Sequence, residues 1–267
     1  EVKSAPVELP KAKPPAQEKR IAPPVLKADN APIAFDWVVI PASEFLMGSD
    51  KKKDPNAEDD EMPQHRVYLS EYAIARVPVT NAQYKRFVDA TRYAKPSHWT
   101  SGEIPQGFEN HPVVYVGWKD AQAFCLWAKV RLPTEAEWEK AARGVDGAIY
   151  PWGNTPPNDD RLNYNKRIGT TTPVGNYQNG KSIYGILDMA GNVWEWVADW
   201  YDEKYYTNSP TKDPAGPASG NYHVIRGGSW YNEARGVRSS DRYLRFVHDS
   251  GYYGVGFRVV QSVSPGS

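Results

Sequence analysis

The sequence predicts an α+β domain in which a few helices pack on small sheets and long ordered loops join them. Short apolar runs with strand character occur near both ends of the chain. Two capping-box patterns, Thr80 with Gln83 and Thr134 with Glu137, indicate where helices begin. Between residues 144 and 196 the chain is rich in Gly, Asn and aromatic residues without a regular period, which is typical of ordered loops.

Residues 1–33 differ in composition from the rest of the chain. They are rich in Pro, Lys and Ala and hold too little apolar material to fold, so we expect a disordered, semi-extended tether. Such a tether commonly holds a domain away from an anchoring point, and the alternative is a disordered tail without consequence. The folded domain is then expected over residues 34–267.

The regular elements follow in order. Strands are expected at 37–41 and 44–48, joined by a Pro-containing turn, and at 65–69 and 72–75, where apolar and polar residues alternate as in half-buried strands. Helices are expected at 81–90, 118–128 and 135–143. The last strands are expected at 224–229 and 256–260.

Composition excludes several classes of function. The formal net charge of the 267 residues is +0, so no overall field would attract nucleic acid. No apolar run approaches the roughly 18 residues that span a bilayer, and we expect no direct membrane insertion. Cys125 is the only cysteine in this sequence; it lies in an amphipathic helical pattern and is expected to be buried and unreactive.

The segment 226–260 is the strongest candidate for a binding surface. Its ends look like strands, and the residues between them are rich in Tyr and Arg without a period of 2 or 3.6. Aromatic residues in such a segment either fold back onto the core or contact a partner, where Tyr and Arg are enriched. We expect most of these rings to be accessible and clustered: Tyr231, Tyr243, Phe246, Tyr252 and Tyr253.

Several motifs agree on a family. They are Met47-Gly48, Pro78-Val79-Thr80-Asn81, the run 131–139, the run 191–196, Arg226-Gly227-Gly228-Ser229-Trp230 and Gly256-Phe257-Arg258. As a set they resemble the formylglycine-generating enzyme family, also called the sulfatase-modifying-factor domain, over about residues 35–260. The resemblance implies a C-type-lectin-like fold of the formylglycine-generating-enzyme type. It does not fix the activity, because function depends on the site rather than on the fold.

The oxidases of that family bind copper through a cysteine pair that follows the Gly-Gly-Ser motif. The corresponding stretch here, residues 230–238, contains no sulfur, and copper(I) selects thiolate ligands. We therefore expect no copper site, no catalytic residue and no enzymatic activity. The alternatives are a copper-dependent oxidase or another modifying enzyme with an unfamiliar site on the same fold, and a pseudo-enzyme with one fixed partner.

The segment 226–260 also resembles the variable region of the variable proteins of diversity-generating retroelements. The resemblance implies a display protein that binds a protein or other surface macromolecule, placed at a bacterial cell surface or in a secreted assembly. Framework arginines are expected between the ligand-contacting positions. Those positions are Tyr231, Asn232, Gly236, Asp241, Tyr243, Leu244, Phe246, Tyr252, Tyr253 and Gly254.

One stretch matches a calcium site of the oxidases. The resemblance implies that the side chains of Asp188 and Glu195 and the carbonyls of Gly191 and Val193 would bind Ca²⁺, which prefers oxygen ligands. The alternative is that Glu195 pairs with an arginine and Asp188 caps a turn.

Overall fold

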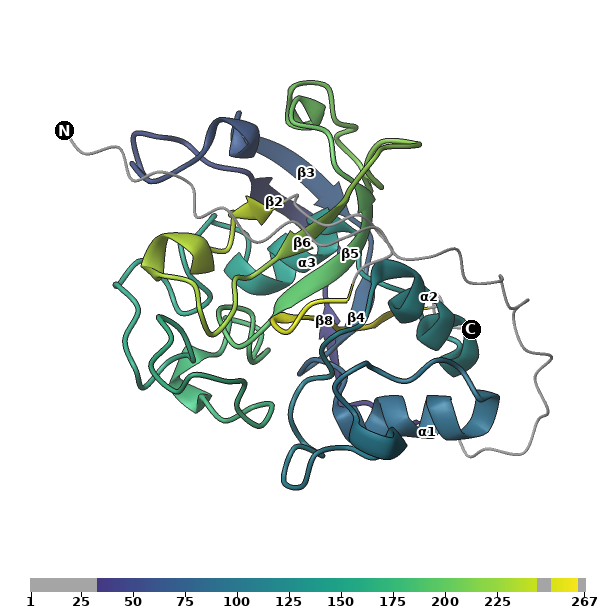
Figure 1. The fold of residues 1–267 in the computed structure, drawn as a ribbon. Coiled ribbons are helices and arrows are strands. Elements are labelled where there is room, and N and C mark those ends of the chain that lie inside the picture. Colours follow the sequence, from purple (N-terminus) through teal and green to yellow (C-terminus); the bar gives the residue numbers. More distant parts are fainter. Residues whose placement is uncertain (1–32, 244–250, 264–267) are drawn as a thin grey trace.

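Three small sheets organise the part of the chain that the computed structural model describes, residues 33–243 and 251–263 (Figure 1). The first sheet has the order β1-β4-β9, the second pairs β2 with β3, and the third has the order β7-β6-β5-β8. All neighbours are antiparallel except β5 and β8. The strands are β1 (Trp37–Ile40), β2 (Ser43–Met47), β3 (His65–Leu69), β4 (Tyr72–Ala75), β5 (Trp194–Trp200), β6 (His223–Arg226), β7 (Arg242–Tyr243), β8 (Val255–Phe257) and β9 (Val260–Ser262).

The three α-helices begin where local sequence signals place them. They are α1 (Asn81–Thr91), α2 (Trp118–Ala128) and α3 (Glu135–Arg143). Thr80 and Thr134 each accept a hydrogen bond from the backbone N–H three residues on, and Gln83 and Glu137 complete the two capping boxes. Short 3-10 turns occupy Asp59–Glu61, Thr100–Gly102, Gln178–Gly180, Tyr205–Thr207 and Ala234–Val237.

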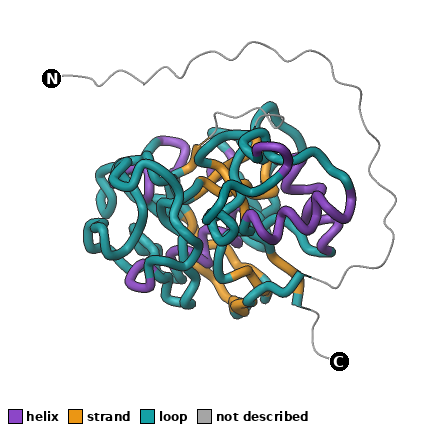
Figure 2. Tube along the Cα trace, turned by 60° about the horizontal axis from the view of Figure 1, so that its bottom comes forward, coloured by secondary structure: helices purple, strands orange, loops and turns teal. Residues whose placement is uncertain are grey.

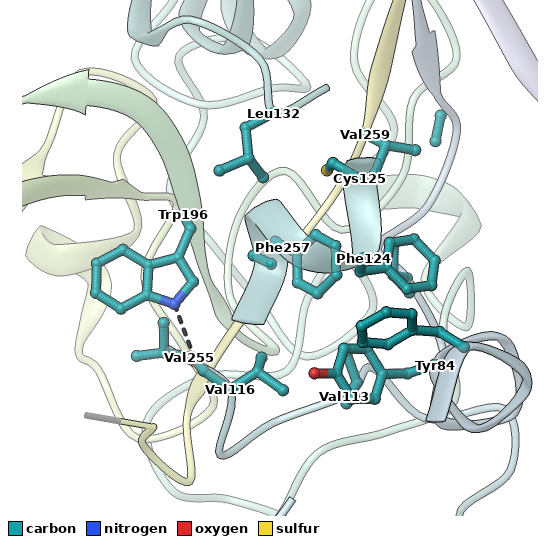
Figure 3. Close-up of a cluster of buried hydrophobic side chains, with 14 of the residues drawn as sticks. Tyr84, Val113, Val116, Phe124, Cys125, Leu132, Trp196, Val255, Phe257 and Val259 are labelled. Carbon is teal, nitrogen blue, oxygen red and sulfur yellow. Dashed lines mark hydrogen bonds between the residues drawn. The ribbon is translucent and has the colours of Figure 1, made fainter. Parts of the chain in front are cut away.

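Two hydrophobic clusters hold these elements together. In the first, α1 and α2 lie side by side and cover β8, and Tyr84, Phe124 and Phe257 meet there (Figures 1 and 3). Trp196 of β5 closes this cluster and donates its indole N–H to the Val116 carbonyl at 3.0 Å (Figure 3). In the second cluster, α3 contacts β2, β3, β5 and β6 and therefore joins two sheets. Helix α3 is buried along its whole length.

Loops dominate one side of the molecule (Figure 2). Between α3 and β5 the chain consists of loops, turns and the short 3-10 helix Gln178–Gly180. The Gly-, Asn- and aromatic-rich composition of this stretch had indicated ordered loops. Tyr150, Leu162 and Ala190 of the same stretch form a third, smaller cluster with Val237 of the 3-10 turn Ala234–Val237. The order of these loops therefore rests on local packing and on hydrogen bonds rather than on strand pairing.

The structure differs from the sequence-based expectation at several strands, including β7, which was not expected. Residues 194–196, the start of β5, were expected to belong to a loop, because the stretch before them is rich in Gly, Asn and aromatic residues. The expected strand 256–260 is two strands, β8 and β9, which belong to different sheets. β4 is buried on both faces rather than half-buried, since it is the central strand of its sheet.

The predicted tether lies outside the described residues except for Ile33. That residue is 9% exposed and packs in the first core cluster, so the folded part already includes the last residue assigned to the tether. Within residues 33–243 and 251–263, none of the helices has the length and apolar character needed to cross a bilayer.

Candidate ligand-binding face

The candidate site begins where β6 ends in a turn that requires glycine. Gly227 and Gly228 have φ values of +96° and +71°, a region that side chains other than glycine rarely adopt. A Cβ on Gly228 would lie 2.2 Å from the Gly236 carbonyl oxygen, and one on Gly227 would lie 2.9 Å from Trp138. The Gly-Gly pair therefore lets the chain leave the sheet close to α3 and enter the binding segment.

Buried arginines hold this segment on α3. Arg226 is fully buried and its guanidinium donates to Glu139 at 2.5 Å and to Glu135 at 3.3 Å. It also donates to the carbonyls of Ser239 and Ser240 at 2.8 and 2.9 Å. Because these carbonyls lie within the binding segment, a side chain of β6 fixes the backbone of that segment to the helix.

Two more buried arginines hold the segment in the same way. Arg238 pairs with carboxylates of the acidic loop that precedes β3, and Arg242 pairs with a carboxylate of α3. Arg238 donates to both oxygens of Glu61 and to Asp54, and Arg242 donates to both oxygens of Glu135. Burial alone would raise the pKa of Glu61, but the hydrogen bonds and charge of Arg238 outweigh it and lower that pKa. These arginines are buried framework residues, as the resemblance implied.

Asp241 is a correction to the predicted contact residues. It is 9% exposed and lies 3.6 Å from the Arg238 guanidinium, which already pairs with two other carboxylates. Burial raises the pKa of Asp241 to about 7, against a smaller lowering by Arg238. Its side chain belongs to the buried network around Arg238.

A tight turn at Ser229 presents the first ring. The amide and hydroxyl of Ser229 both donate to Asn232 Oδ1, at 3.0 and 2.8 Å. Asn232 and Gly236 are half-buried, and the Asn232 carboxamide oxygen is used to close the turn. The predicted contact residue Asn232 therefore also has a structural role, which is to fix where Tyr231 emerges.

Four rings lie together on the surface and form what we call the aromatic face: Trp230, Tyr231, Tyr252 and Tyr253. The ring centroid of Tyr253 lies 5.3 Å from Tyr231, 5.5 Å from Tyr252 and 5.7 Å from Trp230. All four side chains are half-buried, so each is packed on one side and accessible on the other. Burial raises the pKa of Tyr231 to about 12, so its hydroxyl stays protonated at neutral pH.

The remaining predicted contact residues have different positions. Tyr243 is half-buried but stacks on the buried Trp194, with centroids 5.3 Å apart and planes at 22°. Gly254 is buried; a Cβ there would lie 2.5 Å from the Tyr231 ring, and its carbonyl accepts from the Trp194 amide at 2.9 Å. Gly254 is therefore a spacer beneath Tyr231 and not a contact. Leu244 and Phe246 lie outside the described residues.

Sequence reasoning missed Tyr115, which contacts the aromatic face, and His98, which packs against Tyr115. Tyr115, with φ of +58°, donates its amide to the Tyr252 carbonyl at 2.8 Å, and its half-buried ring lies 4.8 Å from that of His98. A Cβ on Gly251 would lie 2.3 Å from the Tyr115 backbone, so the two segments are in close contact. Nothing local in the sequence links positions 115 and 252, because only the tertiary fold brings them together.

The residues assigned to calcium have protein partners in this structure. Glu195 accepts from Arg258 at 2.6 and 2.7 Å and from the Trp138 indole at 2.7 Å. Asp188 accepts from the Gly175 amide at 2.6 Å, and burial raises the pKa of Asp188 to about 6. An arginine partner for Glu195 and a backbone partner for Asp188 are what the alternative to a calcium site predicts. Calcium binding by Asp188, Gly191, Val193 and Glu195 stays a prediction, and it requires Glu195 to exchange Arg258 for the cation.

The donors after the Gly-Gly-Ser motif do not fit copper. Residues 230–238 offer an amide, a phenol, a carboxylate and guanidinium groups but no thiolate. Cys125 is 4% exposed on α2, and burial raises the pKa of its thiol far above its usual range. Burial of this kind disfavours the thiolate, which is the form that binds copper and acts as a nucleophile.

Comparison with known proteins places the chain among characterised sequences. Residues 24–263 match the family model described as sulfatase-modifying factor enzyme 1-like domain. A formylglycine-generating enzyme of Streptomyces coelicolor is 37% identical over 248 residues, covering 72% of this chain and 78% of the relative. A hercynine oxygenase of Mycolicibacterium smegmatis is 34% identical over 241 residues, covering 77% of this chain and 56% of the relative.

Solved structures agree on the fold. PvdO from Pseudomonas aeruginosa superposes with a TM-score of 0.74 at 26% identity, covering 88% of this chain and all of that one. Treponema denticola variable protein 1 superposes with a TM-score of 0.70 at 24% identity, covering 86% of this chain and 95% of that one. The α+β, C-type-lectin-like fold of the formylglycine-generating-enzyme type is thereby confirmed.

The expectation that the protein is not an enzyme is contradicted by these comparisons. The named relatives at 34–37% identity are a formylglycine-generating enzyme and a hercynine oxygenase, which are enzymes. The expectation failed because it rested on one missing cysteine pair. That absence excludes chemistry through those thiolates, and it carries no information about other chemistry on the same fold.

Proposed function

Because the chain belongs to the sulfatase-modifying factor enzyme 1-like domain family, we propose that its C-terminal segment is a recognition surface on the family's frame, and that the aromatic face binds a protein ligand. The observation that carries the proposal is the cluster of Trp230, Tyr231, Tyr252 and Tyr253, half-exposed and in mutual contact. Large, rigid rings of this kind provide contact area at low entropic cost.

The rigidity of the surrounding frame supports the proposal. Arg226, Arg238 and Arg242 are buried and hold the chain on both sides of Trp230 and Tyr231, so little conformational freedom is lost there when a ligand binds. The four rings lie on one surface, where a ligand can contact them together. A broad contact of this type suits a macromolecule better than a small molecule, which prefers a concave site.

The aromatic face can be tested with matched variants. Full-length protein carrying Tyr231→Ala and Tyr253→Ala is compared with wild type in capture of surface-protein extracts, and captured proteins are purified and titrated. We expect affinity to fall at least about tenfold, as for interface hot spots. Leu126→Ala is the control, since Leu126 is 69% exposed on α2. Equal affinity of wild type and the tyrosine variant at an unchanged melting temperature would refute the proposal.

We further propose that accessible positions of the segment vary between strains through a retroelement while the frame stays fixed. Val237, Arg238, Ser239 and Arg242 belong to a buried block, and half-buried residues flank it: Tyr231, Asn232 and Gly236 before it and Tyr243 after it. This division separates framework from exchangeable positions. Sequencing this gene and its neighbouring DNA in several strains tests this. Substitutions spread evenly over buried and accessible positions, with no adjacent template repeat, would contradict it.

The location proposed for such a binding surface is a bacterial cell surface or a secreted assembly. A protein ligand outside the cell would need the aromatic face to be presented there, with the residues before Ile33 as the tether. Protease treatment of intact cells that produce the epitope-tagged full chain tests this location. A tag that is protected in intact cells and absent from the medium would contradict it.

A further inference from the structure

The aromatic face presents hydrogen-bond donors as well as ring surfaces. The Trp230 indole N–H and the Tyr253 hydroxyl make no hydrogen bond to another described residue. Both side chains are half-buried, yet neither polar atom belongs to the buried, unpaired atoms of the described chain, so both atoms reach solvent. A partner that offers acceptors and flat apolar groups would therefore use the donors and the rings together.

A proline-rich stretch of the same chain offers the complementary groups. Residues 10–15 read Pro-Lys-Ala-Lys-Pro-Pro. In the polyproline II conformation a stretch of this kind has no internal hydrogen bonds, and its prolines have no N–H, so its carbonyls are free to accept. Surfaces lined by aromatic rings are what bind such segments. Lys11 and Lys13 add ammonium groups, which the faces of aromatic rings attract.

The chain is long enough to bring this stretch to the face. The described part begins at Ile33, which packs in the first core cluster, and Tyr231 and Tyr252 pack against the same cluster. At about 3.1 Å per residue the chain from Pro15 to Ile33 spans roughly 55 Å. A domain of this size has a diameter of roughly 45 Å. Pro24 could move only roughly 28 Å from Ile33, so residues 10–15 reach more of the surface.

We propose that residues 10–15 dock on the aromatic face of their own molecule. The rings of Pro14 and Pro15 pack on the tyrosines of the face, and carbonyls of the stretch accept from the Trp230 indole and the Tyr253 hydroxyl. The covalent link gives the stretch an effective concentration on the order of one millimolar, so a contact with a Kd near that value forms in about half of the molecules. That docking competes with a protein ligand rests on the proposed function; docking itself does not.

The first test uses the indole N–H signals of the full-length, ¹⁵N-labelled protein. In the variant Pro14→Gly with Pro15→Gly we expect the Trp230 signal to shift relative to wild type. The signals of Trp138 and Trp196 should stay in place, because their indoles donate to acceptors inside the protein.

The matched control is Pro23→Gly with Pro24→Gly, which removes the other proline pair of this part of the chain and should leave the Trp230 signal as in wild type. An unchanged Trp230 signal in the first variant, or a shift in the control alone, would refute docking by residues 10–15.

A spin label tests proximity within one molecule. A nitroxide is attached to Ala12→Cys in the full chain; Cys125 is 4% exposed and stays unlabelled. We expect broadening of the Tyr231 and Tyr253 amide signals and none at Leu126, which is 69% exposed on α2. A mixture of ¹⁵N-labelled wild type with spin-labelled protein of natural isotope content should show none. Broadening spread evenly over the surface, or equally strong in the mixture because a second copy supplies the stretch, would overturn the proposal.

Variants separate this inference from the proposed function. Tyr231→Ala with Tyr253→Ala should lose both the docked stretch and the captured protein ligand. Pro14→Gly with Pro15→Gly should lose only docking and should bind the captured ligand up to about twofold more tightly, since the occupied half of the molecules becomes available. Weaker ligand binding by the tyrosine variant without any broadening from position 12 would refute docking alone. Broadening in wild type with full ligand affinity in the tyrosine variant would refute the proposed function alone.

Discussion

Arg258 is the residue on which three segments of the chain converge. It is fully buried, pairs with both oxygens of Glu195 on β5, and donates to the carbonyls of Ala75 and Leu187 at 3.1 and 3.0 Å. A buried pair of this kind adds little net stability, but removing one partner leaves an uncompensated charge. The Gly-Phe-Arg motif therefore has a structural explanation in this chain.

We predict that Arg258→Met lowers the free energy of unfolding by about 3–5 kcal/mol, because Glu195 loses its counter-charge in the interior. Urea denaturation at neutral pH measures the change. The double variant Arg258→Met with Glu195→Gln should recover part of the loss, since it removes the stranded charge. A single variant as stable as wild type would show that Glu195 finds another partner, such as a bound cation.

Asp241 gives a second prediction at the residue scale. Its pKa of about 7 in the folded state lies above the ordinary 3.8, so between about pH 4 and 7 the unfolded carboxyl ionises while the folded one keeps its proton. The unfolded state then binds fewer protons, and this group lowers stability as pH rises through that window.

Asp241→Asn cannot ionise, so its stability should fall less between pH 4.5 and 8 than that of wild type. At about 1.36 kcal/mol per pKa unit, wild type should lose at most about 4 kcal/mol more unfolding free energy than the variant by pH 8. Chemical denaturation at both pH values measures it, with the exposed Asp160→Asn as control. Parallel pH profiles for wild type and Asp241→Asn would contradict the assignment.

At the scale of elements, α3 differs from an ordinary amphipathic helix. It is buried on all sides, and its carboxylates Glu135 and Glu139 neutralise arginines from β6 and β7. Lys140 of the same helix donates to the Pro41 and Ser43 carbonyls at 2.8 and 3.0 Å, and burial lowers the pKa of Lys140 to about 8. The helix thus positions the binding segment and the β1–β2 turn together.

Because α3 must begin correctly to place these charges, its N-cap is a sensitive position. Thr134→Ala removes the side-chain acceptor for the Glu137 amide, which lies at 3.1 Å, and we expect a loss of about 1 kcal/mol. Thermal unfolding with Thr134→Ser as the conservative control measures it. The serine variant should behave as wild type, and an equal loss in both variants would mean that the Thr134 methyl group, not the cap, is responsible.

At the scale of the whole molecule, the long loops are ordered by packing and by buried polar contacts. The loop 188–195 would gain further order from calcium if the cation displaced Arg258 from Glu195. We predict a calorimetric binding signal and a rise in melting temperature on addition of calcium, both weakened in Asp188→Asn. Magnesium, which demands smaller and more regular coordination, is the control. No heat and no thermal shift with calcium would remove the cation from the description of this protein.

The sequence alone determined the helices, most strands and the family, because these depend on patterns among residues that are close together in the chain. Thr80 with Gln83 and Thr134 with Glu137 specify helix starts within three residues. The buried Cys125 also follows from the local pattern of its helix. Glycine at 227 and 228 belongs to a motif that can be recognised without a structure.

Only the tertiary structure decided which residues of the segment 226–260 face outward. Gly254 follows the half-buried Tyr253 in the chain, yet it lies under the Tyr231 ring, and Asp241 lies two residues before the half-buried Tyr243, yet it is buried beside Arg238. Whether a side chain reaches the surface depends on contacts with residues far away in sequence. For the same reason the sequence did not predict Tyr115 at this face. It contacts Tyr252 only because the fold packs two segments that are far apart in the chain against each other.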